Sequence, residues 1–526
     1  MKNKNILILL LSFISILFVS IGFVFAQGFD FVTSQEIQTG LSPIFSLAED
    51  FNKDGDLDLA VANRSSGTIS ILLGDSLGSF SLLNNFNVGF DPVDIASGDF
   101  NEDGILDLAS SNAASNNISI LLGNGNGSFF DGGTFFISLF QPIPVSIASG
   151  DFNNDNHLDL IAGNFRDNSI SILFGDGTSH FSQPSINITV GSPVVIQIPG
   201  GGEQIFIGIS SVKTADFNED GNLDIAVVHN KDRTIFILSG DGAGNLLISK
   251  TLPIGFDSRS LSVADLNKDD KDDLIAGSQS GISVYLGDGN NNFMSKPMFS
   301  LGSLQASMAV ADFNADGNLD LSAPNFFGGG VDVIAGDGGG GFVGSVASFL
   351  TGSRPRGATS GDFNKDDLLD LVITNSGSGT DSISILINNT LPPIIRVNID
   401  LKPNSFPNCI NLKSKGTTPL AILGGDDFDV KEIDISSVKI TGASVNIKGN
   451  GEFHSSFEDV NLDSYLDLIL HFNTADLQLR GDETEIFLSG NLVDGKAIEG
   501  SDNICFVKTL SHFLLEFPSL FLNMFG

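Results

Sequence analysis

The chain has 526 residues, with 63 Asp and Glu against 26 Lys and Arg, and its formal charge is −37. This balance argues against a nucleic-acid partner, because phosphate binding requires clustered Lys and Arg. Hydrophobic residues make up 41% of the chain and charged residues 17%, which excludes an acidic disordered protein. Two cysteines are too few for a disulfide-dense scaffold or a four-cysteine zinc site.

Residues 1–26 have the pattern of a signal peptide. Lys2 and Lys4 precede an apolar run, and Val24-Phe25-Ala26 resembles a signal-peptidase site before Gln27. An uncleaved anchor is the alternative, because the run approaches the ~20 residues that span a bilayer. We therefore expect a secreted or cell-surface protein, with a membrane contact only if this segment is retained.

A ten-residue phrase recurs along the chain and organises most of it. It reads DFNKDGDLDL in its first copy, and the seven copies begin at Asp50, Asp99, Asp151, Asp216, Asp265, Asp312 and Asp362. Apolar runs before and after each phrase, a β-branched stretch and a Gly-rich turn indicate four short strands per repeat. Four strands in each repeat of about 50 residues are typical of propeller blades. We expect an all-β fold with a seven-bladed β-propeller over residues 27–392.

The ends of the repeat region predict how the ring closes. The seventh repeat stops at residues 382–386, where its third strand is expected, and lacks a fourth. Residues 29–32 begin a strand that no earlier repeat accounts for. We expect this strand to complete blade seven, because closure would leave no long exposed sheet edge.

After the repeats, residues 393–508 are expected to form a C-terminal β-rich, sandwich-like domain with one further phrase at 459–468. Residues 509–526 form an apolar tail that is too short to span a membrane. Cys409 and Cys505 stand near the two ends of this domain. We predict a disulfide between them, since the chain is expected to be exported; two buried free thiols are the alternative.

The phrase has the chemistry of a calcium loop. It offers side-chain oxygens at positions 1, 3, 5 and 9 and a backbone carbonyl at position 7. Ca²⁺ prefers six to eight oxygen ligands with several carboxylates, and Gly at position 6 permits a sharp turn. A metal-free turn rich in Asp and Asn is the alternative, but its repeated carboxylates would repel one another.

We therefore predict Ca²⁺ as the cofactor of all eight phrases. The predicted ligands in the first four are Asp50, Asn52, Asp54, Asp56, Asp58, Asp99, Asn101, Asp103, Asp107, Asp151, Asn153, Asp155, Asp159, Asp216, Asn218, Asp220, Asn222 and Asp224. Those in the others are Asp265, Asn267, Asp269, Asp273, Asp312, Asn314, Asp316, Asn318, Asp320, Asp362, Asn364, Asp366, Asp370, Asp459, Asn461, Asp463 and Asp467.

With their DxNxDGxxDL spacing, the seven phrases resemble the FG-GAP or VCBS repeats of the integrin α-subunit propeller and of many secreted bacterial proteins. The resemblance covers residues 28 to about 391. It implies that each phrase is a calcium loop between the first and second strands of a blade. It implies no particular reaction, because members of the family adhere, bind glycans or, in a few cases, catalyse.

The sequence carries no Ser/His/Asp elbow, HExxH or P-loop motif, so we do not expect an enzyme. His454 and His471 flank the C-terminal phrase. They are expected to pack within the β-rich domain, with a metal or catalytic site as the alternative.

Arginine is concentrated in loops expected on the face opposite the metal loops. The six residues are Arg64, Arg166, Arg233, Arg259, Arg354 and Arg356. Their guanidinium groups could bind carboxylates or sulfates bidentately; bridging of blades or solubility is the alternative. We predict a binding or adhesion module for an extracellular anionic glycan or protein. The alternative is a polysaccharide-acting, lyase-like enzyme on the same scaffold.

Overall fold

A computed structural model describes residues 28–507, apart from 138–141, 183–185, 192–195, 199–201, 205–207, 302–306, 378–379, 391–393, 404, 426–427 and 494. The chain divides into two units, residues 1–391 and 392–526, and each is described by itself. The predicted signal peptide and the apolar tail lie outside the described residues. Within those residues, no helix has the length and apolar character needed to cross a bilayer.

The described part of the first unit contains seven four-stranded antiparallel sheets, which are the predicted propeller blades. Blade one contains β2 (Pro43–Glu49), β3 (Asp58–Asn63), β4 (Thr68–Gly74) and β5 (Phe80–Asn87). Blade two contains β6 (Pro92–Gly98), β7 (Asp107–Asn112), β8 (Asn117–Gly123) and β9 (Phe129–Phe136). Blade three contains β10 (Pro144–Gly150), β11 (Asp159–Asn164), β12 (Ser169–Leu173) and β13 (Ile186–Thr189). A hairpin of β14 (Ile196–Ile198) and β15 (Gly202–Gln204) follows.

The remaining blades continue the same order. Blade four contains β16 (Ile209–Ala215), β17 (Asp224–His229), β18 (Thr234–Gly240) and β19 (Leu246–Pro253). Blade five contains β20 (Ser260–Ala264), β21 (Asp273–Ser278), β22 (Gly281–Gly287) and β23 (Phe293–Ser295). Blade six contains β24 (Ala309–Ala311), β25 (Asp320–Asn325), β26 (Gly330–Gly336) and β27 (Phe342–Leu350). Blade seven has β28 (Pro355–Gly361), β29 (Asp370–Gly377) and β30 (Thr380–Asn388).

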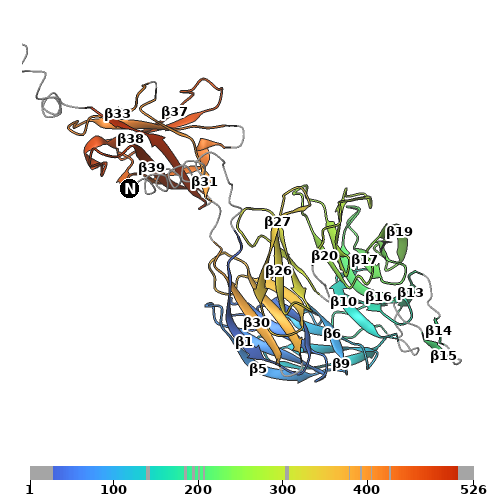
Figure 1. Cartoon of the computed structure of the whole chain (residues 1–526). Coiled ribbons are helices and arrows are strands. Elements are labelled where there is room, and N and C mark those ends of the chain that lie inside the picture. The colour runs from blue at the N-terminus through green and yellow to red at the C-terminus, as the bar shows by residue number, and fades with distance from the viewer. Residues whose placement is uncertain are drawn as a thin grey trace, which may run out of the picture. The chain divides into compact units, whose positions relative to one another are not determined.

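The N-terminal strand completes blade seven, as the ends of the repeat region predict. Strand β1 (Phe31–Gln38) pairs antiparallel with β30, from Phe31 opposite Asn388 to Gln38 opposite Ser382. Figure 1 shows the blue β1 beside the yellow-orange β30. This pairing joins the two ends of the repeat region and closes the ring.

The core of the propeller lies between neighbouring blades because successive strand residues point to opposite faces of a sheet. In β3, Leu59 and Val61 pack against blade seven, whereas Ala60 and Ala62 pack against blade two. Each of the seven blade junctions has such a buried apolar cluster among the described residues. The alternating apolar residues of the second strands therefore hold the ring together.

Phenylalanine connects the phrases to the next blade. Position 2 of the first phrase, Phe51, contacts Phe129 at the start of β9, with ring centroids 5.7 Å apart. The same edge-to-face contact joins Phe363 to Phe80 across the closing junction, at 5.2 Å. Edge-to-face aromatic pairs contribute beyond their buried area. Some of the 44 Phe residues of the chain thus form a repeated contact between neighbouring blades.

The second unit packs two sheets around one core. One sheet has the order β31 (Ile395–Arg396), β40 (Ala497–Asn503), β39 (Glu485–Leu492), β35 (Ile433–Ile440) and β36 (Ala443–Ser444). The other has the order β32 (Ile399–Leu401), β34 (Thr417–Ile422), β38 (Asp467–Asn473) and β37 (Ser455–Glu458). Two short 3₁₀ helices, η1 (Val430–Glu432) and η2 (Thr474–Asp476), complete its described part. Side chains of both sheets share one buried cluster, as the predicted sandwich-like domain requires.

The two cysteines stand opposite each other in a short parallel strand pair. Strands β33 (Cys409–Ile410) and β41 (Cys505–Phe506) align Cys409 with Cys505. The two residues form a disulfide, with Cα atoms 4.3 Å apart.

Candidate metal loops and ligand pocket

Each phrase forms a tight loop between the first and second strands of its blade. In the first loop, the two carboxylate oxygens of Asp50 accept hydrogen bonds from the amides of Asp54 (3.2 Å) and Gly55 (2.9 Å). The Asn52 side-chain oxygen also accepts from the Asp54 amide, at 2.8 Å. The chain therefore curls around the carboxylate at position 1. In the other seven loops the aspartate at position 1 accepts the same two amide hydrogen bonds: Asp99, Asp151, Asp216, Asp265, Asp312, Asp362 and Asp459.

The loop backbone is left-handed at two positions, of which the sequence predicts one. Position 6 has a positive φ whether it is Gly55 (88°) or Asp367 (68°), so the copies without glycine adopt the same turn. Position 4 is left-handed too, although no copy has glycine there; Lys53, for example, has φ of 62°. Such backbone strain persists where surrounding bonds fix it. The varied residues at position 4 gave no sequence signal for this conformation.

The aspartate at position 9 anchors the loop to its blade. Asp58 is fully buried, and its two oxygens accept from the amides of Phe51 (3.1 Å) and Gly74 (3.0 Å). Gly74 ends the third strand, where a Cβ atom would lie 2.3 Å from the Leu57 carbonyl oxygen. The sequence predicts Asp58 as a metal ligand. It did not predict the hydrogen bond that Asp58 accepts from the Gly74 amide at the end of β4.

The carboxylates of a loop lie close enough to affect one another. Burial raises the pKa of Asp58 to about 6, opposed by its two amide hydrogen bonds and assisted by repulsion from Asp54 and Asp50. In the described part of the chain, no three acidic, His or Cys side chains are already gathered as a metal centre. The fit to a metal rests on the donors: oxygen atoms only, three of them carboxylates, on one tight loop. These are the ligands that Ca²⁺ prefers.

Neighbouring loops contact each other around the ring through position 4. Lys53 Nζ donates to the Gly104 carbonyl of the next loop at 2.7 Å. The corresponding pairs are Glu102 with His157, Asn154 with Asn222, Glu219 with Lys271, and Lys365 with Asp56. Ala315 occupies position 4 of the sixth loop, and its methyl group offers no polar contact to the seventh. Five of the seven pairs of neighbouring propeller loops are thus linked through position 4 in the described structure.

The eighth phrase repeats this loop in the second unit. Asp459 and Asn461 accept from the Asp463 amide at 3.2 and 3.1 Å. Asp467 accepts from the amides of Val460 (2.8 Å) and Gly424 (2.9 Å), as the position-9 aspartates do in the propeller. The nearby His454 and His471 rings stack, with centroids 3.9 Å apart. This stacking agrees with the expected packing role of the two histidines.

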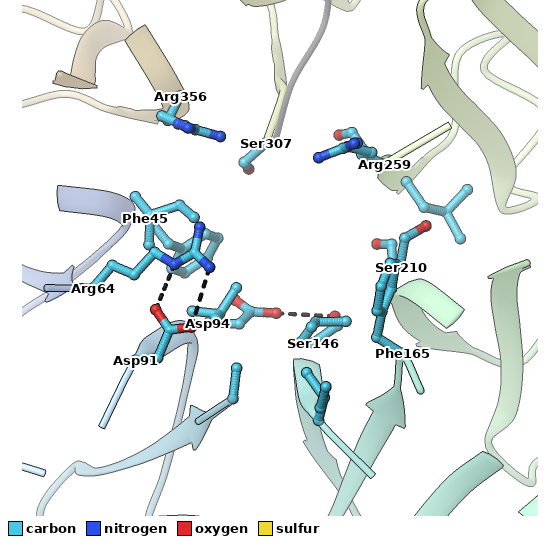
Figure 2. A pocket seen from close by; sticks show the side chains of 18 of the residues that line it. Phe45, Arg64, Asp91, Asp94, Ser146, Phe165, Ser210, Arg259, Ser307 and Arg356 are labelled. Atoms are coloured by element: carbon cyan, nitrogen blue, oxygen red, sulfur yellow. Dashed lines mark hydrogen bonds and ion pairs between the residues drawn. The ribbon is translucent and has the colours of Figure 1, made fainter. Parts of the chain in front are cut away.

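A pocket of about 500 Å³ lies where the first strands of the blades begin. The candidate metal loops follow the other ends of these strands. It is lined by the beginnings of these strands and by the loops between strands two and three and between blades. Figure 2 shows side chains of several blades around its open centre. The described pocket therefore lies away from the metal loops, on the face where the arginines were predicted.

The structure divides the predicted arginine set. Arg64, Arg259 and Arg356 line the pocket, whereas Arg166, Arg233 and Arg354 are not among its lining residues. Arg64 forms a bidentate ion pair with Asp91. Arg259 makes a similar pair with Asp257, at 2.9 and 3.2 Å. These two acids, which the sequence reasoning did not single out, neutralise two of the three pocket arginines.

Arg356 differs from the other pocket arginines. Its Nε donates to the Ser376 hydroxyl at 3.0 Å, and its guanidinium lies 4.6 Å from the centroid of the Phe326 ring. Among the described residues it has no carboxylate partner. Burial, followed by repulsion from Arg64, Arg259 and Arg354, lowers the pKa of Arg356. Guanidinium groups bind carboxylates and phosphates through paired hydrogen bonds, and the Arg356 group has no such partner among the described residues.

Comparison with known proteins agrees with this architecture. A family model described as FG-GAP-like repeat matches residues 50–110, 99–162, 216–276 and 265–323. A search of curated proteins finds no match. Two similar solved structures are BBS1N in complex with ARL6DN (15% identity, TM-score 0.46, 68% of this chain and 98% of that one) and an Agrocybe aegerita lectin specific for non-reducing terminal N-acetylglucosamine (17%, 0.40, 65% and 86%). Both TM-scores are below 0.5, so only the family match supports the repeat architecture.

Proposed function

The chain carries FG-GAP-like repeats across residues 50–323, and from this premise we propose that it is an extracellular calcium-binding propeller that serves as a binding or adhesion module. Asp50, Asn52, Asp54 and Asp58, with their counterparts in the other loops, would hold Ca²⁺. The ion would supply positive charge to carboxylates that otherwise repel one another. The disulfide between Cys409 and Cys505 supports an oxidising, extracellular location.

The ligand site of the module is the pocket on the face opposite the loops. Arg356 carries this proposal, because it is a half-buried cation without a carboxylate partner among the described residues. The chain has a formal charge of −37, so most of its surface is expected to repel anions. An unpaired cation in the pocket would attract them there. The expected partner is an anionic extracellular glycan or protein. The metal loops would keep the blades, and so the lining residues, in place.

An array of acidic and neutral glycans tests this function, probed with the full secreted chain in Ca²⁺ and in EDTA. We expect acidic glycans to bind in Ca²⁺ and Arg356→Gln to abolish most of that binding. Arg233→Gln is the matched control, because Arg233 lies outside the pocket lining. Equal loss in both variants, or binding unaffected by either, would contradict the proposed site. Release of shortened or unsaturated sugars would instead support the lyase-like alternative.

A further inference from the structure

We infer that the pocket accepts a hydroxylated carboxylic acid, such as a terminal uronic-acid residue, with its carboxylate on Arg356 and its hydroxyl groups on Asp94 and Ser146. This inference rests on the proposed function and names the ligand class of the same pocket. In Figure 2, Arg356 and Ser307 lie across the open centre from Asp94 and Ser146. A ligand seated there would meet a cation on one side and hydrogen-bonding oxygens on the other.

The charges of the pocket leave room for one carboxylate. Its lining contains four basic side chains, Arg64, Lys213, Arg259 and Arg356, and two acidic ones, Asp91 and Asp94. A third acid, Asp257, pairs with Arg259. Arg64 is paired with Asp91. Burial raises the pKa of Asp94, and attraction from Lys213 opposes that rise and favours the carboxylate form. One positive charge of the lining, on Arg356, is therefore left without a counter-charge.

Arg356 is held in a fixed orientation for that contact. Its guanidinium packs on Phe326 and its Nε is bonded to Ser376. This leaves the Nη groups to donate, and guanidinium groups bind planar carboxylates through two parallel hydrogen bonds. Lysine in the same place would keep the charge but lose the planar fork. The carboxylate contact is thus expected to depend on arginine and not on charge alone.

The opposite side of the pocket carries a pre-organised acceptor. Asp94 on β6 accepts from Ser146 Oγ (3.0 Å) and from the amides of Ile147 (3.1 Å) and Ile95 (3.0 Å). Lys213 and these three hydrogen bonds favour the ionised form of Asp94 against the effect of burial. In that form the carboxylate has about four acceptor sites, so one remains for a ligand hydroxyl. Ser146 in turn accepts from the Val212 amide at 3.2 Å. Three blades therefore fix this acceptor, as a precise binding site requires.

The size and walls of the pocket suit a sugar ring. Its volume of about 500 Å³ lies within the ~300–1,000 Å³ typical of small-molecule sites. Phe45 and Phe165 provide apolar walls, against which the C–H faces of a ring can pack. Ser210, Ser260 and Ser307 add hydroxyl groups to the lining. This mixture matches a ring that is apolar on its faces and polar at its edge.

Isothermal titration of the full chain in Ca²⁺ tests the inference with three ligands. One has both the carboxylate and the hydroxyls, and each of the others lacks one of these two features. They are methyl β-D-glucuronide, methyl β-D-glucoside without the carboxylate, and cyclohexanecarboxylate without the hydroxyls. We expect the glucuronide to bind at least about tenfold more tightly than either, since a charge-assisted hydrogen bond contributes about that factor. Arg356→Lys should lose the advantage over the glucoside, and Asp94→Asn should lose the advantage over cyclohexanecarboxylate. Arg233→Gln should keep both.

The outcomes separate the ligand class from the proposed function. A glucoside that binds as tightly as the glucuronide would overturn the role of Arg356. Cyclohexanecarboxylate that binds as tightly as the glucuronide would overturn the role of Asp94. A sulfated monosaccharide that binds more tightly than the glucuronide and needs Arg356 would reject the carboxylate class but leave the anion-binding module standing. If no acidic glycan or sugar acid binds the wild-type chain, both fail. Circular dichroism of each variant excludes loss of fold as the cause.

Discussion

The Lys365 ammonium of the seventh metal loop forms an ion pair with the Asp56 carboxylate of the first loop. Blade seven is also completed by β1 from the N-terminal end of the repeats. The junction at which the chain closes its ring therefore carries both a strand pairing and a contact between metal loops. The Phe80–Phe363 ring contact lies in the same junction.

We expect Lys365→Ala to lower the melting temperature of the propeller slightly, because it removes a link across the closing junction. The pair is exposed to solvent, so salt should reduce the difference between variant and wild type. Lys415→Ala in the second unit is the matched control and should leave the propeller transition unchanged. Differential scanning calorimetry at low and high salt measures both. A variant whose propeller unfolds at the wild-type temperature at low salt would show that the contact does not stabilise closure.

Much of the propeller could be predicted because its signal repeats. The seven phrases give the blade count, and the apolar runs before and after each phrase give the strands. The packing of Leu59 and Ala60 on opposite faces of the blade became visible only in the structure. The missing fourth strand of the last repeat gives the closing strand β1. Each inference uses a local sequence pattern or its repetition along the chain, where periodicity is informative.

The missed features depend on residues that meet only after folding. The bond from the Gly74 amide to Asp58 spans two strands, and the glycine alone did not reveal its partner. The ion pair of Arg64 with Asp91 joins two loops 27 residues apart, so the sequence grouped Arg64 with Arg356. Only the side-chain contacts distinguish a neutralised arginine from one that is available to a ligand.

Two proposed calcium ligands of the second loop differ in their structural role, because Asp107 also anchors the loop to its blade and Asp103 does not. Asp107→Ala leaves the buried amides of Phe100 and Gly123 without their acceptor, and each such loss costs about 1–3 kcal/mol. We expect about 2–6 kcal/mol of destabilisation even in EDTA. Asp103→Ala, at an exposed position, should change stability little in EDTA but reduce bound calcium by one ion. Equal behaviour of both variants in urea unfolding with and without Ca²⁺ would contradict this division.

Reduction of Cys409–Cys505 should selectively destabilise the second unit. The bridge spans 96 residues, for which the chain-entropy model gives about 4–5 kcal/mol as an upper value. We expect a lower unfolding temperature for this unit in reductant and an unchanged propeller transition. Intact-mass analysis after alkylation without reductant should show no modified cysteine. Two alkylated cysteines would reject the bridge in the secreted protein.

Calcium-dependent unfolding of the full chain tests the central claim most directly. A ligand that binds the folded state alone raises stability through mass action, so the propeller transition should move to higher temperature as Ca²⁺ increases and return on addition of EDTA. Mg²⁺ at the same concentration is the control, because it requires a stricter octahedral geometry. We predict a calcium-specific increase that saturates with occupancy of the loops. A propeller transition at the same temperature in Ca²⁺ and in EDTA would contradict the calcium-binding function.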